Sequence, residues 1–88
     1  MKIIFKQSFL KTLTKNRNKS LKDDIADAIE NVELAININE IRNIKKLKGY
    51  KDFYRIKIGS YRLGLKIEKD IVYFVDIDHR KDIYKHFP

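Results

Sequence analysis

The feature that most constrains the fold of this 88-residue sequence is a pair of alternating apolar and polar runs around a Gly-Ser dipeptide. The runs extend over Phe53–Ile58 and Tyr61–Ile67, and Gly59-Ser60 separates them. Such alternation indicates strands with one buried face, and a two-residue Gly-X connection is typical of a type II′ turn. We therefore predict an antiparallel hairpin that folds on Gly59-Ser60, with Ile58 paired with Tyr61.

This register sorts the side chains of the hairpin onto two faces. The face expected to pack against helices contains Ile56, Ile58, Leu63, Leu65 and Ile67. The other face gathers Arg55, Lys57, Arg62 and Lys66. Lys57 should pair with Arg62, and like charges on paired residues destabilise a sheet. The basic face is therefore either merely solvated or a binding site for phosphate, and Gly64 should leave open space beside Arg55.

The N-terminal half predicts one strand and two helices. Lys2–Lys6 reads as a short strand, and Ser8 as the cap of a short helix that carries Phe9, Leu10 and Leu13. Ser20, with Asp23 three residues later, resembles a capping box at the start of a second helix. An apolar stripe follows at helical spacing. Its members are Leu21, Ile25, Ala28, Ile29, Val32 and Ile36.

The remaining segments complete an antiparallel meander. Ile41–Leu47 should be irregular or a short strand, Ile71–Ile77 a further strand, and Arg80–Phe87 a short helix or an extended tail. The prediction is a single α+β domain over residues 1–88, with the order β-α-α and then the meander. Its two layers consist of one sheet and two helices packed on one face of that sheet.

The length of the connection at Glu68–Asp70 decides which side chains of the last strand are buried. A three-residue connection would point Ile71, Tyr73, Val75 and Ile77 into the core. It would place Phe74, Asp76, Asp78 and Arg80 on the basic face. A two-residue connection would invert this assignment, because side chains alternate along a strand.

Charge and composition limit the partners. Lysine and arginine number 20 against 12 acidic residues, and this net charge of +8 favours an acidic partner, nucleic acid first. The chain has no cysteine and only two histidines, so we expect neither a metal nor another cofactor. No apolar run is long enough to span a membrane, and the N-terminus is not typical of a signal peptide. We expect a cytoplasmic protein without a membrane partner.

Three blocks of sequence, in this order, resemble the RelE/ParE superfamily of toxins from type II toxin–antitoxin modules. The blocks are Lys46-Leu47-Lys48-Gly49, Tyr54–Arg62 and Asp78–Tyr84. The resemblance covers essentially the whole chain and implies the RelE-like two-layer fold. In the RelE-like branch it implies metal-independent cleavage of mRNA on the ribosome, in which the ribose 2′-OH attacks the adjacent phosphate. It further implies a cognate antitoxin, the ribosome and mRNA as partners, and no small-molecule cofactor.

The resemblance assigns catalytic roles to Arg55, Lys57, Arg62, Arg80 and Tyr84. The positive field around Lys57 should favour its neutral form, which suits a general base. Arg55 and Arg62 would neutralise the phosphate, Arg80 would stabilise the leaving 5′-oxygen, and Tyr84 would stack on a base. Further RNA contacts are expected from Lys46, Lys48, Lys66, Lys81 and His79. The general acid is left open between Arg80, His79 and His86. The alternatives are a ParE-like toxin that inhibits DNA gyrase without nuclease activity, and an inactive family member that only binds nucleic acid.

Overall fold

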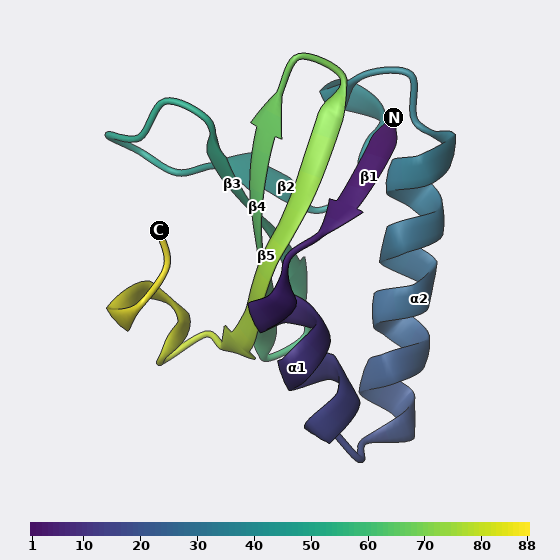
Figure 1. Cartoon of the computed structure of the whole chain (residues 1–88), viewed down its shortest axis with the longest axis vertical. Coiled ribbons are helices and arrows are strands. Elements are labelled where there is room, and N and C mark those ends of the chain that lie inside the picture. Colours follow the sequence, from purple (N-terminus) through teal and green to yellow (C-terminus); the bar gives the residue numbers. More distant parts are fainter.

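The computed structural model describes residues 1–88 and contains one five-stranded sheet with two helices on one side (Figure 1). The strands are β1 (Lys2–Phe5), β2 (Ile44–Lys46), β3 (Phe53–Ile58), β4 (Tyr61–Glu68) and β5 (Ile71–His79). The helices are α1 (Gln7–Lys15) and α2 (Lys19–Leu34), with short 3-10 turns η1 (Ile38–Glu40) and η2 (Ile83–Lys85). The strand order is β1-β5-β4-β3-β2. This arrangement confirms the predicted α+β fold.

Strands β2 to β5 form the predicted antiparallel meander, and β1 adds to its edge parallel to β5. The predicted hairpin register is confirmed, since Ile58 pairs with Tyr61 and Lys57 with Arg62. Gly59 has a φ of +55°, the left-handed value that the first central residue of a type II′ turn requires. Neither helix is long and apolar enough to cross a membrane.

The core lies between the helices and the apolar face of the hairpin. Ile56, Leu63 and Leu65 are fully or almost fully buried there, and no polar side chain is buried with them. Phe9 of α1 contacts Phe74 of β5 with ring centres 5.2 Å apart, which anchors α1 to the sheet. The burial of these aliphatic and aromatic side chains is the main force that holds the two layers together.

Both predicted helix caps are wrong. Helix α1 starts after Lys6, and the Ser8 hydroxyl instead donates a hydrogen bond to the carbonyl of Val75. Helix α2 starts after Asn18, whose side chain accepts from the Leu21 N–H at 3.1 Å. Asn caps helices as well as Ser does, so the earlier residue begins the helix and Ser20 falls within its first turn.

The second helix also ends earlier than its apolar stripe predicts. Leu34 is its last residue, and Ile36 lies beyond it with an exposed fraction of 80%. The N-terminal ammonium group of Met1 donates to the carbonyls of Val32 and Ala35 at 3.1 and 2.7 Å. A positive charge at the carbonyl end of a helix is favourable, and here it satisfies groups that another helical turn would otherwise bond.

Strand β5 begins in the orientation expected for a two-residue connection and changes to the other orientation at a bulge. The connection from β4 has two residues, because Glu68 pairs with Ile71, so Val72 and Phe74 enter the core. The three-residue alternative is therefore wrong, because it placed Phe74 on the basic face and Ile71, Tyr73 and Val75 in the core. The two-residue alternative, which inverts this assignment, is confirmed for this first part of the strand.

A bulge at Val75 restores the predicted orientation for the rest of β5. Leu65 pairs with Phe74 and Gly64 with Asp76, so one residue of β5 is extra at this point. Beyond the bulge Ile77 enters the core, as predicted. Asp76 and Asp78 consequently lie on the basic face of the sheet, which also agrees with the prediction.

The C-terminal segment packs on the face of the sheet opposite the helices (Figure 1). Phe87 is 2% exposed, and its ring occupies the space above Gly64, where a Cβ atom would lie 2.8 Å from the ring. The ring also meets the edge of Phe53 with centres 5.6 Å apart. The prediction of open space at Gly64 is therefore wrong, because a residue distant in sequence fills it.

This contact predicts that Gly64→Ala displaces Phe87. The added methyl group should destabilise the fold by about 1–3 kcal/mol through overpacking, measured by urea unfolding. In a Phe87→Ala background the same substitution should cost less than about 0.5 kcal/mol, because contacting residues are not additive. Equal costs in the two backgrounds would contradict the contact.

Candidate nucleic-acid interface

An open pocket on the basic face collects most of the predicted site residues. Its volume of ≈ 580 Å³ falls within the range of roughly 300–1,000 Å³ typical of ligand sites. It is lined by Lys45, Lys46, Leu47, Lys48, Arg55, Arg62, Arg80 and Tyr84. All its charged residues are cationic, so the pocket is suited to an anion with several charges, such as an RNA backbone.

Four separate segments bring these residues together. Lys45 of β2 pairs with Arg55 of β3, and Arg62 belongs to the neighbouring strand β4. Arg80 follows the end of β5, where its N–H donates to the carbonyl of Ser60 at 2.7 Å. Tyr84 lies on η2 and is 53% exposed. The sheet thus fixes two arginines rigidly, and the C-terminal segment adds one arginine and one aromatic ring.

Backbone carbonyls, rather than carboxylates, hold the two strand arginines. Arg55 donates from Nη1 to the carbonyl of Asn43 at 2.7 Å. Arg62 donates from Nη1 to the carbonyls of Gly59 and Tyr61, both at 2.9 Å. Neither arginine, nor Arg80, belongs to an ion pair. Each guanidinium therefore keeps its full charge and other N–H groups for a ligand.

Asn43 and Lys45 are site residues that sequence reasoning missed. Asn43 has a φ of +63°, a conformation that Asn adopts more readily than most residues. Its carbonyl accepts from the Lys57 N–H at 3.1 Å as well as from Arg55. An Asn just before a short strand was the available signal, but only the fold shows which arginine it holds.

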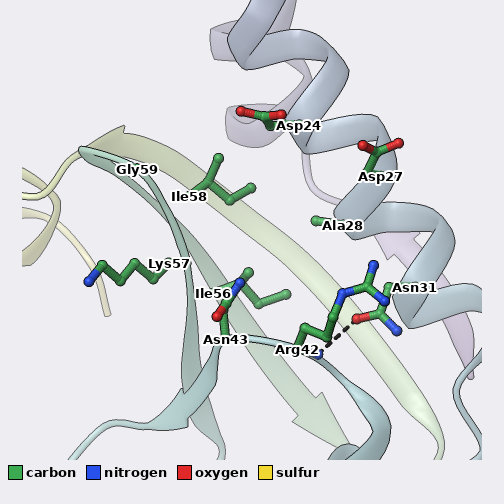
Figure 2. A pocket seen from close by; sticks show the side chains of 10 residues that line it. All are labelled: Asp24, Asp27, Ala28, Asn31, Arg42, Asn43, Ile56, Lys57, Ile58 and Gly59. Carbon is green, nitrogen blue, oxygen red and sulfur yellow. Dashed lines mark hydrogen bonds between the residues drawn. The ribbon is translucent and has the colours of Figure 1, made fainter.

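Lys57 lies on the basic face but outside this pocket. It is exposed, and its side chain extends away from helix α2 (Figure 2). It is instead one of the residues that line a second pocket of ≈ 260 Å³ between β3 and α2, together with Asp24, Asp27 and Arg42 (Figure 2). That pocket contains both signs of charge, so it is a poorer match to a polyanion than the purely cationic one.

Three of the five residues predicted to contact RNA lie outside the cationic pocket. Lys66 forms an ion pair with Glu68 at 3.0 Å, and this hydrogen bond raises the lysine pKa. His79 packs against the ring of Tyr61 with centres 5.6 Å apart. The exposed Lys81 donates its N–H to Nδ1 of His79 at 3.3 Å. Lys46 and Lys48, in contrast, line the pocket as expected.

His86 forms a clamp with the two carboxylates of the basic face. Its Nδ1 lies 2.9 Å from Asp76 Oδ2, and its Nε2 lies 2.7 Å from Asp78 Oδ2. The hydrogen bond to Asp78 raises the pKa of His86, and Asp76 adds to this effect against the opposing influence of burial. Each ring nitrogen faces a carboxylate oxygen, so the protonated ring can donate to both carboxylates at once.

Asp78 shows the complementary change. Burial favours its neutral form, but the hydrogen bonds from His86 and from the His79 N–H outweigh burial and lower its pKa. The two shifts have opposite directions, and both favour the charged pair of an imidazolium with a carboxylate. The clamp fastens the C-terminal segment, including Arg80 and Tyr84, to strand β5.

Comparison with known proteins places this geometry among toxins. The family model described as "ParE toxin of type II toxin-antitoxin system, parDE" matches residues 3–84. Toxin RelE3 of Methanocaldococcus jannaschii is 37% identical over 89 residues, which span 100% of this chain and 100% of that protein.

Solved structures give the same result. The RelB–RelE antitoxin–toxin complex from Methanococcus jannaschii matches with a TM-score of 0.79 and 34% identity, covering 97% of this chain and 99% of that one. The intact E. coli RelBE complex matches with a TM-score of 0.69 and 24% identity, covering 89% and 94%. At that lower identity the likeness shows the fold alone.

The clamp predicts a pH-dependent contribution to stability. Because the pKa of His86 is raised from 6.5, its contribution is complete below pH 6.5 and is lost as pH rises through the raised value. The contribution of Asp78, whose pKa is lowered from 3.8, is complete above pH 3.8 and is lost as pH falls through the lowered value. His86→Gln should therefore cost about 0.5–1 kcal/mol at pH 5.5, and less at pH 9, in urea unfolding.

His79→Gln provides the matched control, since it removes the other histidine and leaves the clamp intact. It should not reproduce this change in cost between the two pH values. If His86→Gln lowers the free energy of unfolding equally at pH 5.5 and pH 9, the imidazole contributes only packing.

Proposed function

The chain belongs to the RelE/ParE superfamily of type II toxin–antitoxin toxins, and we propose that it is a ribosome-dependent mRNA endoribonuclease that inhibits translation. The observation that carries this proposal is the purely cationic pocket, with two strand arginines anchored by neutral carbonyls. Preorganised guanidinium groups stabilise charge that develops on a phosphate, and they do so without reorganising during the reaction.

In the proposed reaction the ribose 2′-OH is the nucleophile. Its oxygen forms a bond to the adjacent phosphorus while the bond from phosphorus to the 5′-oxygen breaks. The products are a 2′,3′-cyclic phosphate and a 5′-hydroxyl. Arg55 and Arg62 neutralise the charge on the phosphate oxygens, and Lys57, next to them on the same face, accepts the proton of the 2′-OH.

Arg80 is assigned the stabilisation of the negative charge that develops on the leaving 5′-oxygen. An arginine does not give up a proton in proteins, so we assign the protonation of this oxygen to water. His86 is a poor candidate for the acid, because both of its ring nitrogens are engaged with carboxylates, at 2.9 and 2.7 Å. Tyr84, half exposed at the pocket, is positioned to stack on a base and so hold the RNA chain.

The antitoxin partner is also part of the proposal. Similar solved structures are toxin–antitoxin complexes. An acidic or amphipathic antitoxin segment that covers the cationic pocket would neutralise it and block RNA. The toxin would act in the cytoplasm, where ribosomes translate mRNA.

We test the proposal by mapping new mRNA 5′ ends in a translation reaction that contains the purified protein. Cleavage within codons is expected with the wild-type chain. Arg55→Ala and Arg62→Ala should each reduce its rate by about 10²-fold or more, the effect of removing one preorganised charge donor. Arg17→Ala removes an exposed arginine between α1 and α2 and should leave the rate unchanged.

Intact mRNA at protein concentrations that arrest growth would contradict the proposal. Gyrase-dependent DNA breaks under those conditions would favour the ParE-like alternative, in which the toxin acts by protein contact. Absence of any growth arrest would favour the inactive nucleic-acid-binding alternative.

A further inference from the structure

The cationic face contains two carboxylates that ought to compete with RNA for the arginines. Asp78 of β5 pairs directly with Arg62 of β4. Asp76 pairs with Gly64, whose partner on the other side is Arg55. Opposite charges on paired residues normally attract each other across a strand pair. In this face the expected ion pair between Asp78 and Arg62 is nevertheless absent.

His86 takes the place of the arginines as the partner of both carboxylates. It lies 2.9 Å from Asp76 and 2.7 Å from Asp78, so one imidazolium neutralises much of the negative charge on this face. Meanwhile Arg62 donates to the backbone of the hairpin turn. The two arrangements together separate a small acidic patch from the pocket that would bind phosphate.

The charged groups around this clamp are few. On β5 they are the two carboxylates and the neighbouring His79, which also favours ionised Asp78. On β4 they are Arg62 and Lys66, and on β3 they are Arg55 and Lys57. Within the C-terminal segment Lys85 and Asp82 pair with each other at 3.0 Å. His86 is thus the cation that contacts both carboxylates.

We propose that protonated His86 is a positioning residue of the RNA site, which keeps Asp76 and Asp78 from engaging Arg62 and holds Arg80 and Tyr84 at the pocket. This inference rests on the proposed RNA substrate. A neutral imidazole has a single N–H, so it can donate to only one carboxylate. Deprotonation therefore frees a negative charge beside Arg62 and loosens the segment that carries Arg80 and Tyr84. RNA affinity should consequently fall as His86 loses its proton.

The experiment measures binding of a fluorescent single-stranded RNA whose 2′-hydroxyls are methylated, so that cleavage cannot occur. Lysines and arginines stay largely charged up to pH 9, and RNA phosphodiesters do not titrate in this range. Between pH 6 and pH 9 the wild-type affinity should fall about five- to tenfold, the lower range of coupling between two sites.

Three variants separate the role of the charge from the role of packing. His86→Arg retains a permanent cation with a two-pronged donor geometry, so its affinity should stay within about twofold of wild type at pH 6 and should not change by pH 9. His86→Gln should bind weakly at both pH values. His79→Gln should keep the wild-type pH dependence. A wild-type pH dependence in His86→Gln or His86→Arg would overturn the proposal.

A second readout does not depend on RNA. In NMR spectra of the free His79→Gln protein, in which His86 is the remaining histidine, the backbone signals of Arg80 and Tyr84 should move with the titration of the His86 ring. They should be stationary over this range when His86→Arg is added. If these signals do not move with the titration of the ring, the positioning role is overturned. Failure to bind RNA at any pH, with these signals moving as expected, would instead refute the proposed function and leave the clamp supported.

Discussion

The register of the hairpin around Gly59-Ser60 is the constraint on which the rest of this structure depends. Side chains alternate along a strand, so a slip of one residue would exchange Leu63 in the core for Arg62. A buried, unpaired guanidinium would cost several kcal/mol, and the apolar face would be exposed to water. The turn and the hydrophobic pattern therefore specify the same register. The same register therefore places the apolar side chains of the hairpin in the core and its two arginines in the cationic pocket.

The alternation of side chains also constrains strand β5, which satisfies it through a bulge and not through a turn. Its two-residue connection to β4 brings Phe74 into the core, and without correction Asp76 and Asp78 would follow on the wrong face. The bulge at Val75 corrects the alternation, and Ser8 of α1 satisfies the Val75 carbonyl. Helix α1 therefore does more than cover the core. It supports the irregularity that places the two carboxylates opposite it, on the outer face.

These differences show what the sequence could predict. The hairpin was predictable because its register depends on neighbouring residues and on a turn with a strong local signal. The orientation of β5 depended on the exact length of a connection and on a bulge, and neither has such a signal. The space at Gly64 was misjudged for a related reason. Phe87, which fills this space, lies 23 residues after Gly64 in the sequence, and only tertiary packing brings the two residues together.

The candidate site was also predictable only where it depends on the local sequence pattern. Arg55 and Arg62 could be assigned to one face from the alternation, but their anchors are backbone carbonyls whose positions depend on local backbone conformation. A concentrated positive charge opposes folding, and placing carboxylates next to the arginines would relieve that repulsion at the expense of phosphate binding. The structure resolves the conflict by separation. The arginines bind neutral carbonyls, His86 holds Asp76 and Asp78, and acidic side chains such as Asp24 and Asp27 lie on α2 across the sheet. Arg55 and Arg62 therefore carry no carboxylate partner, which is the condition that the proposed binding of a polyanion requires.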